Sequence, residues 1–150
     1  MSYCRSALLF FVAILAATPT PGIAQPNAQQ VLSALIKAGL PITGVVTYNA
    51  ATDPNSLLGR PGHYTSKADF EDSRHLASAD DPEASGNTIE VFTTEAAAQK
   101  RQIYTDRIAQ SAPFMFQYVI RRRTIVLRLK KAFLPDQAKA YEAALAKILP

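Results

Sequence analysis

The chain has 150 residues, with 16 Lys and Arg against 12 Asp and Glu, two His and a single cysteine, Cys4. The formal net charge is +4 and 48% of the residues are hydrophobic, which is typical of a globular domain and not of a disordered chain. One cysteine excludes an internal disulfide and a zinc site built on several cysteines. The length predicts one domain with its own hydrophobic core.

The first residues have the pattern of a secretory signal peptide. A short start ending in Arg5 precedes the apolar run Ala7 to Ala17, and small residues then lead to Gly22-Ile23-Ala24. This pattern predicts a signal peptide at residues 1–24, cleaved after Ala24, and a bacterial protein that is exported to the periplasm or secreted. The apolar run is shorter than the ~20 residues of a membrane span, although an uncleaved anchor is the alternative. Cys4 precedes the apolar run instead of marking its cleavage site, so we expect no lipid anchor and a soluble mature chain at 25–150.

The first helix and strand of the mature chain have clear boundaries. Apolar residues at helical spacing predict a helix over 28–38, with Asn27 as its N-cap. Gly39 and Pro41 end this helix, and the β-branched run 42–48 predicts a strand.

The run from Asp53 to Arg74, DPNSLLGRPGHYTSKADFEDSR, is the most informative part of the chain. Its turn-forming first part predicts a loop from Asn49 to His63, pinned to the core by Leu57-Leu58. Alternation then predicts a strand from Tyr64 to Asp72, with one buried side and one charged side facing out. The buried side is Tyr64, Ala68 and Phe70, and the outer side is Thr65, Lys67, Asp69 and Glu71.

The second half repeats the mixture of strands and helices. We expect strands at 88–93, 114–120 and 124–129, a helix at 94–111 and a last helix at 135–149. The buried side of the 94–111 helix is predicted to be Ala96, Ala97, Ile103, Tyr104 and Ile108. Strands in adjacent pairs favour an antiparallel sheet. The sequence therefore predicts a single α+β domain of order α-β-β-β-α-β-β-α, with about five strands and all helices packed on one face.

A long loop of this kind is uncommon in a compact domain unless it binds something, packs as an Ω-loop or is disordered. We therefore predict a non-catalytic ligand- or partner-binding domain that uses the 53–74 segment. The candidate binding residues are Asp53, Asn55, Arg60, His63, Tyr64 and Lys67. The Gly59–Gly62 turn offers an anion its backbone N–H groups and Arg60; alternatively it is a rigid turn with Arg60 paired to Asp53 or Asp72.

The alternative class is an exported hydrolase that uses His63 with Asp53 or Ser66, since a nucleophilic hydroxyl needs a base and an orienting acid. No G-x-S-x-G elbow supports it. The acidic side chains between Asp69 and Glu83 suggest a solvated face more than a calcium site, because calcium needs several oxygens around one point. We predict no catalytic residue, no metal and no cofactor.

Arg121, Arg122 and Arg123 lie between two predicted strands and form a basic cluster. Interleaved with aromatic and apolar residues, such a cluster could contact nucleic acid, but export argues against that partner. A weak contact with an envelope polyanion is the remaining binding role, and a solvated hairpin tip is the plainer one.

The chain also resembles a family of small exported bacterial proteins and lipoproteins of unknown function. The residues that carry the resemblance are the segment DPN-LLGRPG-YTSK, followed by NTIEVFTTEAAAQKR and PDQAKAYEAAL. The likeness covers nearly the whole mature chain and implies export and a single domain. It implies no activity and no catalytic residue. The chain departs from many members in lacking a lipidation cysteine.

Overall fold

The computed structural model describes residues 25–76, 86–112 and 117–149, so the predicted signal peptide and the acidic residues Asp80, Asp81 and Glu83 lie outside the described residues. In chain order, the described elements are α1 (Ala28–Lys37), β1 (Ile42–Thr47), β2 (Tyr64–Asp72), β3 (Asn87–Phe92), α2 (Glu95–Ser111), β4 (Gln117–Arg122), β5 (Ile125–Lys130) and α3 (Pro135–Ile148).

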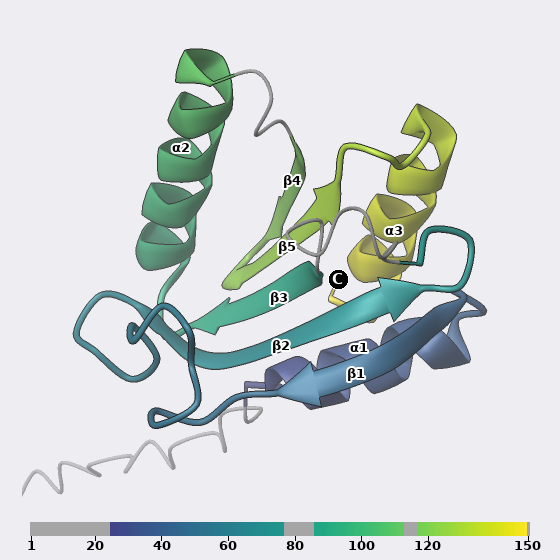
Figure 1. Cartoon of the computed structure of the whole chain (residues 1–150). Coiled ribbons are helices and arrows are strands. Elements are labelled where there is room, and N and C mark those ends of the chain that lie inside the picture. Colours follow the sequence, from purple (N-terminus) through teal and green to yellow (C-terminus); the bar gives the residue numbers. More distant parts are fainter. Residues whose placement is uncertain (1–24, 77–85, 113–116, 150) are drawn as a thin grey trace, which may run out of the picture.

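The strands form one sheet of five, in the order β1-β2-β3-β5-β4, and every described pairing is antiparallel. The predicted α+β class and element order are therefore confirmed (Figure 1). The predicted N-cap is also present, since the Asn27 side chain accepts from the N–H of Gln30 in a capping box.

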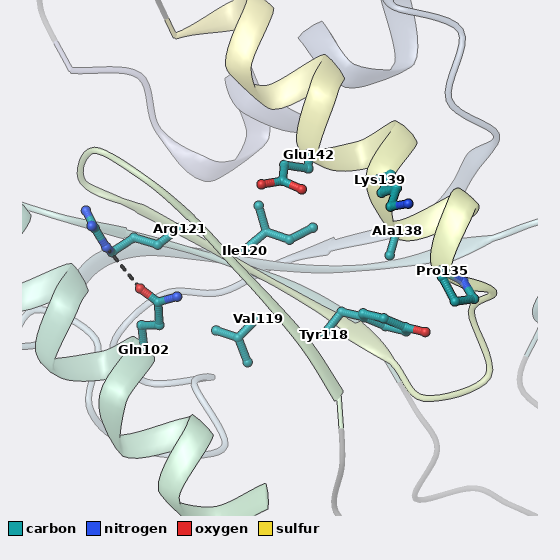
Figure 2. A pocket seen from close by; sticks show the side chains of 9 residues that line it. All are labelled: Gln102, Tyr118, Val119, Ile120, Arg121, Pro135, Ala138, Lys139 and Glu142. Carbon is teal, nitrogen blue, oxygen red and sulfur yellow. Dashed lines mark hydrogen bonds between the residues drawn. The ribbon is translucent and has the colours of Figure 1, made fainter.

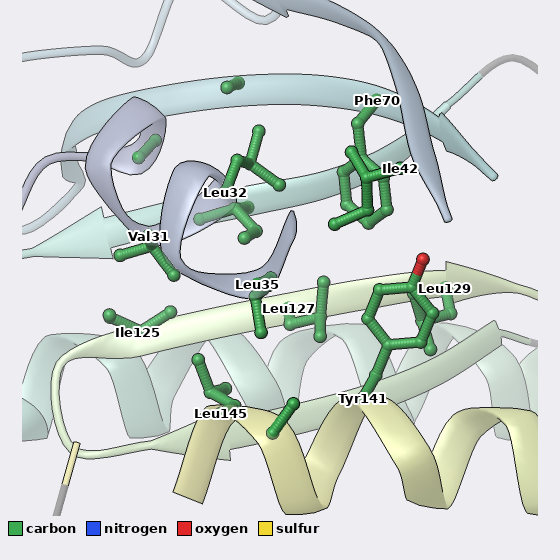
Figure 3. Close-up of a cluster of buried hydrophobic side chains, with 14 of the residues drawn as sticks. Val31, Leu32, Leu35, Ile42, Phe70, Ile125, Leu127, Leu129, Tyr141 and Leu145 are labelled. Carbon is green, nitrogen blue, oxygen red and sulfur yellow. The ribbon is translucent and has the colours of Figure 1, made fainter. Parts of the chain in front are cut away.

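The main core lies between one face of the sheet and the helices α1 and α3 (Figure 3). Alternate residues of β3 and β5, such as Ile89 and Leu127, meet Leu32 and Leu35 of α1 and Tyr141 of α3. This packing follows from the period of two along each strand and the apolar stripe along each helix.

Helix α2 lies on the opposite face, so the prediction that all helices cover one face is wrong. Its residue Ala98 packs with Val126, Phe92 and Tyr64 in a second, smaller cluster. Val126 follows Ile125 along β5 and therefore points away from α1 and α3. Figure 1 shows α2 on the other side of the sheet from α1 and α3.

The predicted buried side of α2 is also wrong, because Ala96, Ile103 and Tyr104 are exposed. The helix instead covers a buried charge: the guanidinium of Arg101 donates to both oxygens of Glu90, at 2.8 and 2.7 Å. Glu90 is fully buried on β3. A helix over a charged site presents small and polar residues to the sheet, and such a face has no apolar periodicity.

A bulge at the start of β2 changes the face on which Tyr64 lies. Tyr64 is opposite Phe92 and Ser66 is opposite Val91. β2 therefore has one extra residue at this point relative to β3, which is a β-bulge. Tyr64 consequently packs with α2 and Phe92, whereas Ala68 and Phe70 belong to the α1 and α3 core. The predicted alternation holds from Ser66 onward and is wrong at Tyr64.

Candidate functional site

The carboxylate of Asp53 holds the loop between β1 and β2 in shape. One oxygen, Oδ2, accepts from the backbone N–H groups of Leu57 at 2.9 Å and Leu58 at 3.0 Å. The same oxygen accepts from the hydroxyl of Tyr64 at 2.6 Å. Asp53 is only 4% exposed. Its side chain thus acts as an internal template around which the loop folds, as an Asx side chain does in a shorter turn.

Lys67 neutralises this carboxylate from below the loop. Its Nζ lies 3.1 Å from Oδ1 of Asp53, and Lys67 is only 3% exposed. The ammonium also lies 4.5 Å from the ring centroid of Tyr48, in cation–π geometry. The prediction that the charged side of β2 faces outward is therefore wrong at Lys67, because the loop folds back over that side.

These contacts change the ionisation of the groups involved. Burial on its own raises the pKa of Asp53, but hydrogen bonds from Tyr64, Leu57 and Lys67 outweigh it and hold the pKa well below its ordinary value. Burial, together with a 2.8 Å hydrogen bond to Asp69, raises the pKa of Tyr48 to about 12. Asp53 is therefore a stable anion at neutral pH, paired within the protein.

Further hydrogen bonds within the loop fix its backbone. The N–H of Gly59 donates to the carbonyl of Tyr64, the N–H of Arg60 to Leu57, and the N–H of His63 to Arg60. Ser56 has a φ of 52°, a left-handed conformation that non-glycine residues seldom adopt. Because these N–H groups are used internally, the Gly59–Gly62 turn offers an anion the Arg60 side chain more than its backbone.

The six predicted binding residues therefore divide into two groups. Asp53, Tyr64 and Lys67 are buried and bind one another. Asn55, Arg60 and His63 are exposed on the outer surface of the loop. Asp53 pairs with Lys67 and Asp72 with Arg74, so neither carboxylate takes the predicted partner Arg60. We call the buried group the latch and the exposed group the rim.

The half-buried Tyr48 contacts the latch through Lys67, and the sequence does not predict this contact. Its position at the end of the first strand run indicated only a strand residue, and nothing in the sequence placed its ring against Lys67. Leu57 and Leu58 do pack against the cluster of Tyr64 and Ala98, which confirms that they pin the loop.

Two of the residues predicted for a hydrolase, Ser66 and Asp53, have partners on opposite sides of β2, whereas the use of His63 stays a prediction. Ser66 Oγ accepts from the N–H of Ala28 on the α1 side of the sheet. Asp53 accepts a hydrogen bond from Lys67. Lys67 follows Ser66 along β2, so its side chain points to the opposite side of the sheet. The strand therefore separates the hydroxyl from the carboxylate.

No group of three or more His, Cys, Asp or Glu in residues 25–76, 86–112 and 117–149 could hold a metal ion. Over the same ranges, no helix has the length and apolar character needed to cross a bilayer.

The three arginines near the β4–β5 turn are all engaged within the fold. Arg121 Nε donates to Gln102 at 3.1 Å, Arg122 Nε donates to the carbonyl of Leu149 at 2.9 Å, and Arg123 pairs with Glu95 at 3.6 Å. Arg123 also supplies the left-handed residue of the turn, with a φ of 51°. The polyanion contact stays a prediction.

Comparison with protein families, with curated proteins and with solved structures found no match for this chain.

Proposed function

We propose that this chain is an exported, non-catalytic binding domain that recognises a partner or small ligand through the rim of Asn55, Arg60 and His63. The observation that carries the proposal is the latch beneath that rim. A buried ion pair, two backbone N–H groups and a tyrosine hydroxyl are all committed to one loop whose outer residues are exposed. Such a loop loses little conformational entropy when it binds, since its shape is already fixed.

The chemistry of the rim suggests what kind of group it recognises. The Asp53 charge is buried and neutralised, so Arg60 is the charged side chain at the exposed surface of the 53–63 segment. A guanidinium binds planar oxyanions with paired hydrogen bonds, and His63 and Asn55 add polar groups that can donate or accept. We therefore expect a ligand that carries a carboxylate or phosphate group. The proposal includes export and membership of the family of small exported bacterial proteins. Export is supported by the signal-peptide pattern, and family membership by the resemblance in the DPN-LLGRPG-YTSK segment.

Site-specific photocross-linking in the producing cells tests the proposal. A photoreactive residue in place of the exposed Pro61, which lies beside Arg60 and leaves the rim intact, should give a discrete adduct, and one in place of the exposed Lys37 on α1 should not. Added wild-type protein should compete for the adduct, whereas Arg60→Ala/His63→Ala protein should not, although its melting temperature is unchanged. Equal adducts at both positions, or equal competition by the double variant, would contradict the assignment.

A further inference from the structure

The two edges of the sheet differ in regularity. The β1 edge is broken between Thr43 and Val46 by a bulge that contains Gly44, whose φ is 55°. The β4 edge is unbroken, with six consecutive residues from Gln117 to Arg122 paired with β5. Bulged edges resist pairing with another strand, and a regular edge presents a row of N–H and C=O groups to it.

A groove of about 390 Å³ runs along this regular edge. Its lining comes from both sides of the sheet, with Gln102 and Arg121 on the α2 side and Lys139 and Glu142 on the α3 side. Figure 2 shows the β4 side chains between these two walls. A groove lined from both faces opens around the strand edge itself, and this is the space that an added strand would occupy.

The α3 side of the groove carries a positive and a negative side chain that could pair with the same two side chains of a second copy of the chain. Lys139 and Glu142 lie almost one helical turn apart, line the same groove and are both exposed. A twofold axis reverses the direction of the second copy, which brings Lys139 of one copy toward Glu142 of the other. A contact of this kind is isologous, because the same patch serves both partners.

The β4 sequence also tolerates pairing with itself. In an antiparallel ladder with Val119 opposite its own copy, Gln117 is opposite Arg121 and Tyr118 is opposite Ile120. This register keeps arginine away from arginine and pairs an aromatic with a β-branched side chain, a favourable cross-strand combination. A register shifted so that Arg121 is opposite its own copy would place like charges together.

We propose that the β4 edge is a dimerisation surface whose occupant is a second copy of this chain, joined so that the two sheets become continuous. The surface is separate from the rim, so either assignment can fail without the other.

Cross-linking tests which edge is used. In a Cys4→Ser background, Val119→Cys should form a dimer with a short bismaleimide, because the two substituted residues lie opposite each other. Val46→Cys, on the bulged β1 edge, is the control: Val46 is 51% exposed and is therefore more accessible to the reagent than the partly buried Val119, yet this variant should remain monomeric on a denaturing gel. A cross-link at Val46→Cys but not at Val119→Cys would overturn the proposal.

A charge swap tests the self-complementary wall without touching the core. In sedimentation equilibrium, Lys139→Glu should weaken dimerisation by roughly tenfold, because two symmetric contacts become repulsive. Lys139→Glu/Glu142→Lys should restore the wild-type dissociation constant. A wild-type chain that is monomeric at every concentration would overturn the proposal, as would a double swap as weak as the single variant. Binding of an extended peptide by that monomer would assign the groove to another partner.

Discussion

At the scale of single residues, the Asp53–Lys67 pair decides the shape of the longest described loop. Burying two charges costs several kcal/mol for each ion unless further hydrogen bonds satisfy them. Asp53 receives such bonds from Leu57, Leu58 and Tyr64, and the Lys67 ammonium also lies against the Tyr48 ring. The pair therefore contributes specificity for one loop conformation more than it contributes stability.

Removing one member of this pair should destabilise the fold strongly. Asp53→Ala should lower the free energy of unfolding by about 3–5 kcal/mol, because Lys67 is left buried without a counter-charge. Asp53→Ala/Lys67→Met should lose much less than the two single variants added together. Urea denaturation measures all three, with the exposed Asp136→Ala as a control that should be nearly neutral. Additive losses would show that the two side chains do not interact.

At the scale of elements, α2 contacts the sheet through a small apolar cluster and through a buried charge contact. Its buried residues are Ala98 and Thr105, and its closest polar contact is the two-pronged bond from Arg101 to Glu90. Arg128 adds a weaker contact to the same carboxylate, at 3.4 Å. The position of α2 therefore depends on keeping the buried Glu90 satisfied.

Arg101→Met tests this dependence, because methionine keeps part of the side-chain volume and removes both hydrogen bonds. The free energy of unfolding should fall by about 1.5–3 kcal/mol, the range for hydrogen bonds to charged groups. Amide exchange should increase first in α2. Lys100→Met, on the exposed side of the same helix, is the matched control and should change little. A loss spread evenly over the whole domain, or an equal loss in the control, would contradict this role for Arg101.

At the scale of the whole molecule, buried carboxylates and tyrosines make the stability of the fold depend on pH. Asp72 is fully buried beneath α3, where Tyr141 donates to it at 2.8 Å and Arg74 at 2.6 Å. Burial on its own raises the pKa of Asp72, but the bonds from Arg74 and Tyr141 lower it overall. Asp53 holds the loop on the other face in the same way.

Because both aspartates have pKa values lowered by folding, their stabilisation is present above the unfolded value, ~4, and is lost as pH falls below it. The raised pKa of Tyr48, about 12, gives the opposite trend: its stabilisation is present below ~10 and is lost as pH rises from 10 to 12. Thermal melts from pH 2 to 12 should show a plateau between these limits. Asp53→Asn should flatten the acid limb, and an unchanged acid limb would contradict the contribution of Asp53.

The local sequence determined the elements of this protein. Local residue patterns placed the helices and strands close to their observed bounds, although β4 continues through Arg122, and Asn27 marked the start of α1. The leucine pair in the loop also indicated its inward side correctly. These features depend on interactions between residues close together in the sequence, so they can be predicted from the local sequence.

The tertiary structure alone decided which residues meet and which face they share. The bulge in β2 directs Tyr64 toward α2. The buried Glu90 pairs with Arg101 of the mostly polar helix α2 on the second face of the sheet. The loop between β1 and β2 folds back and buries Lys67 against Asp53. Each depends on a contact between segments well separated along the chain, and periodicity holds no information about such a partner. The physical reason is that a buried charge is stable only where the fold supplies its counter-charge.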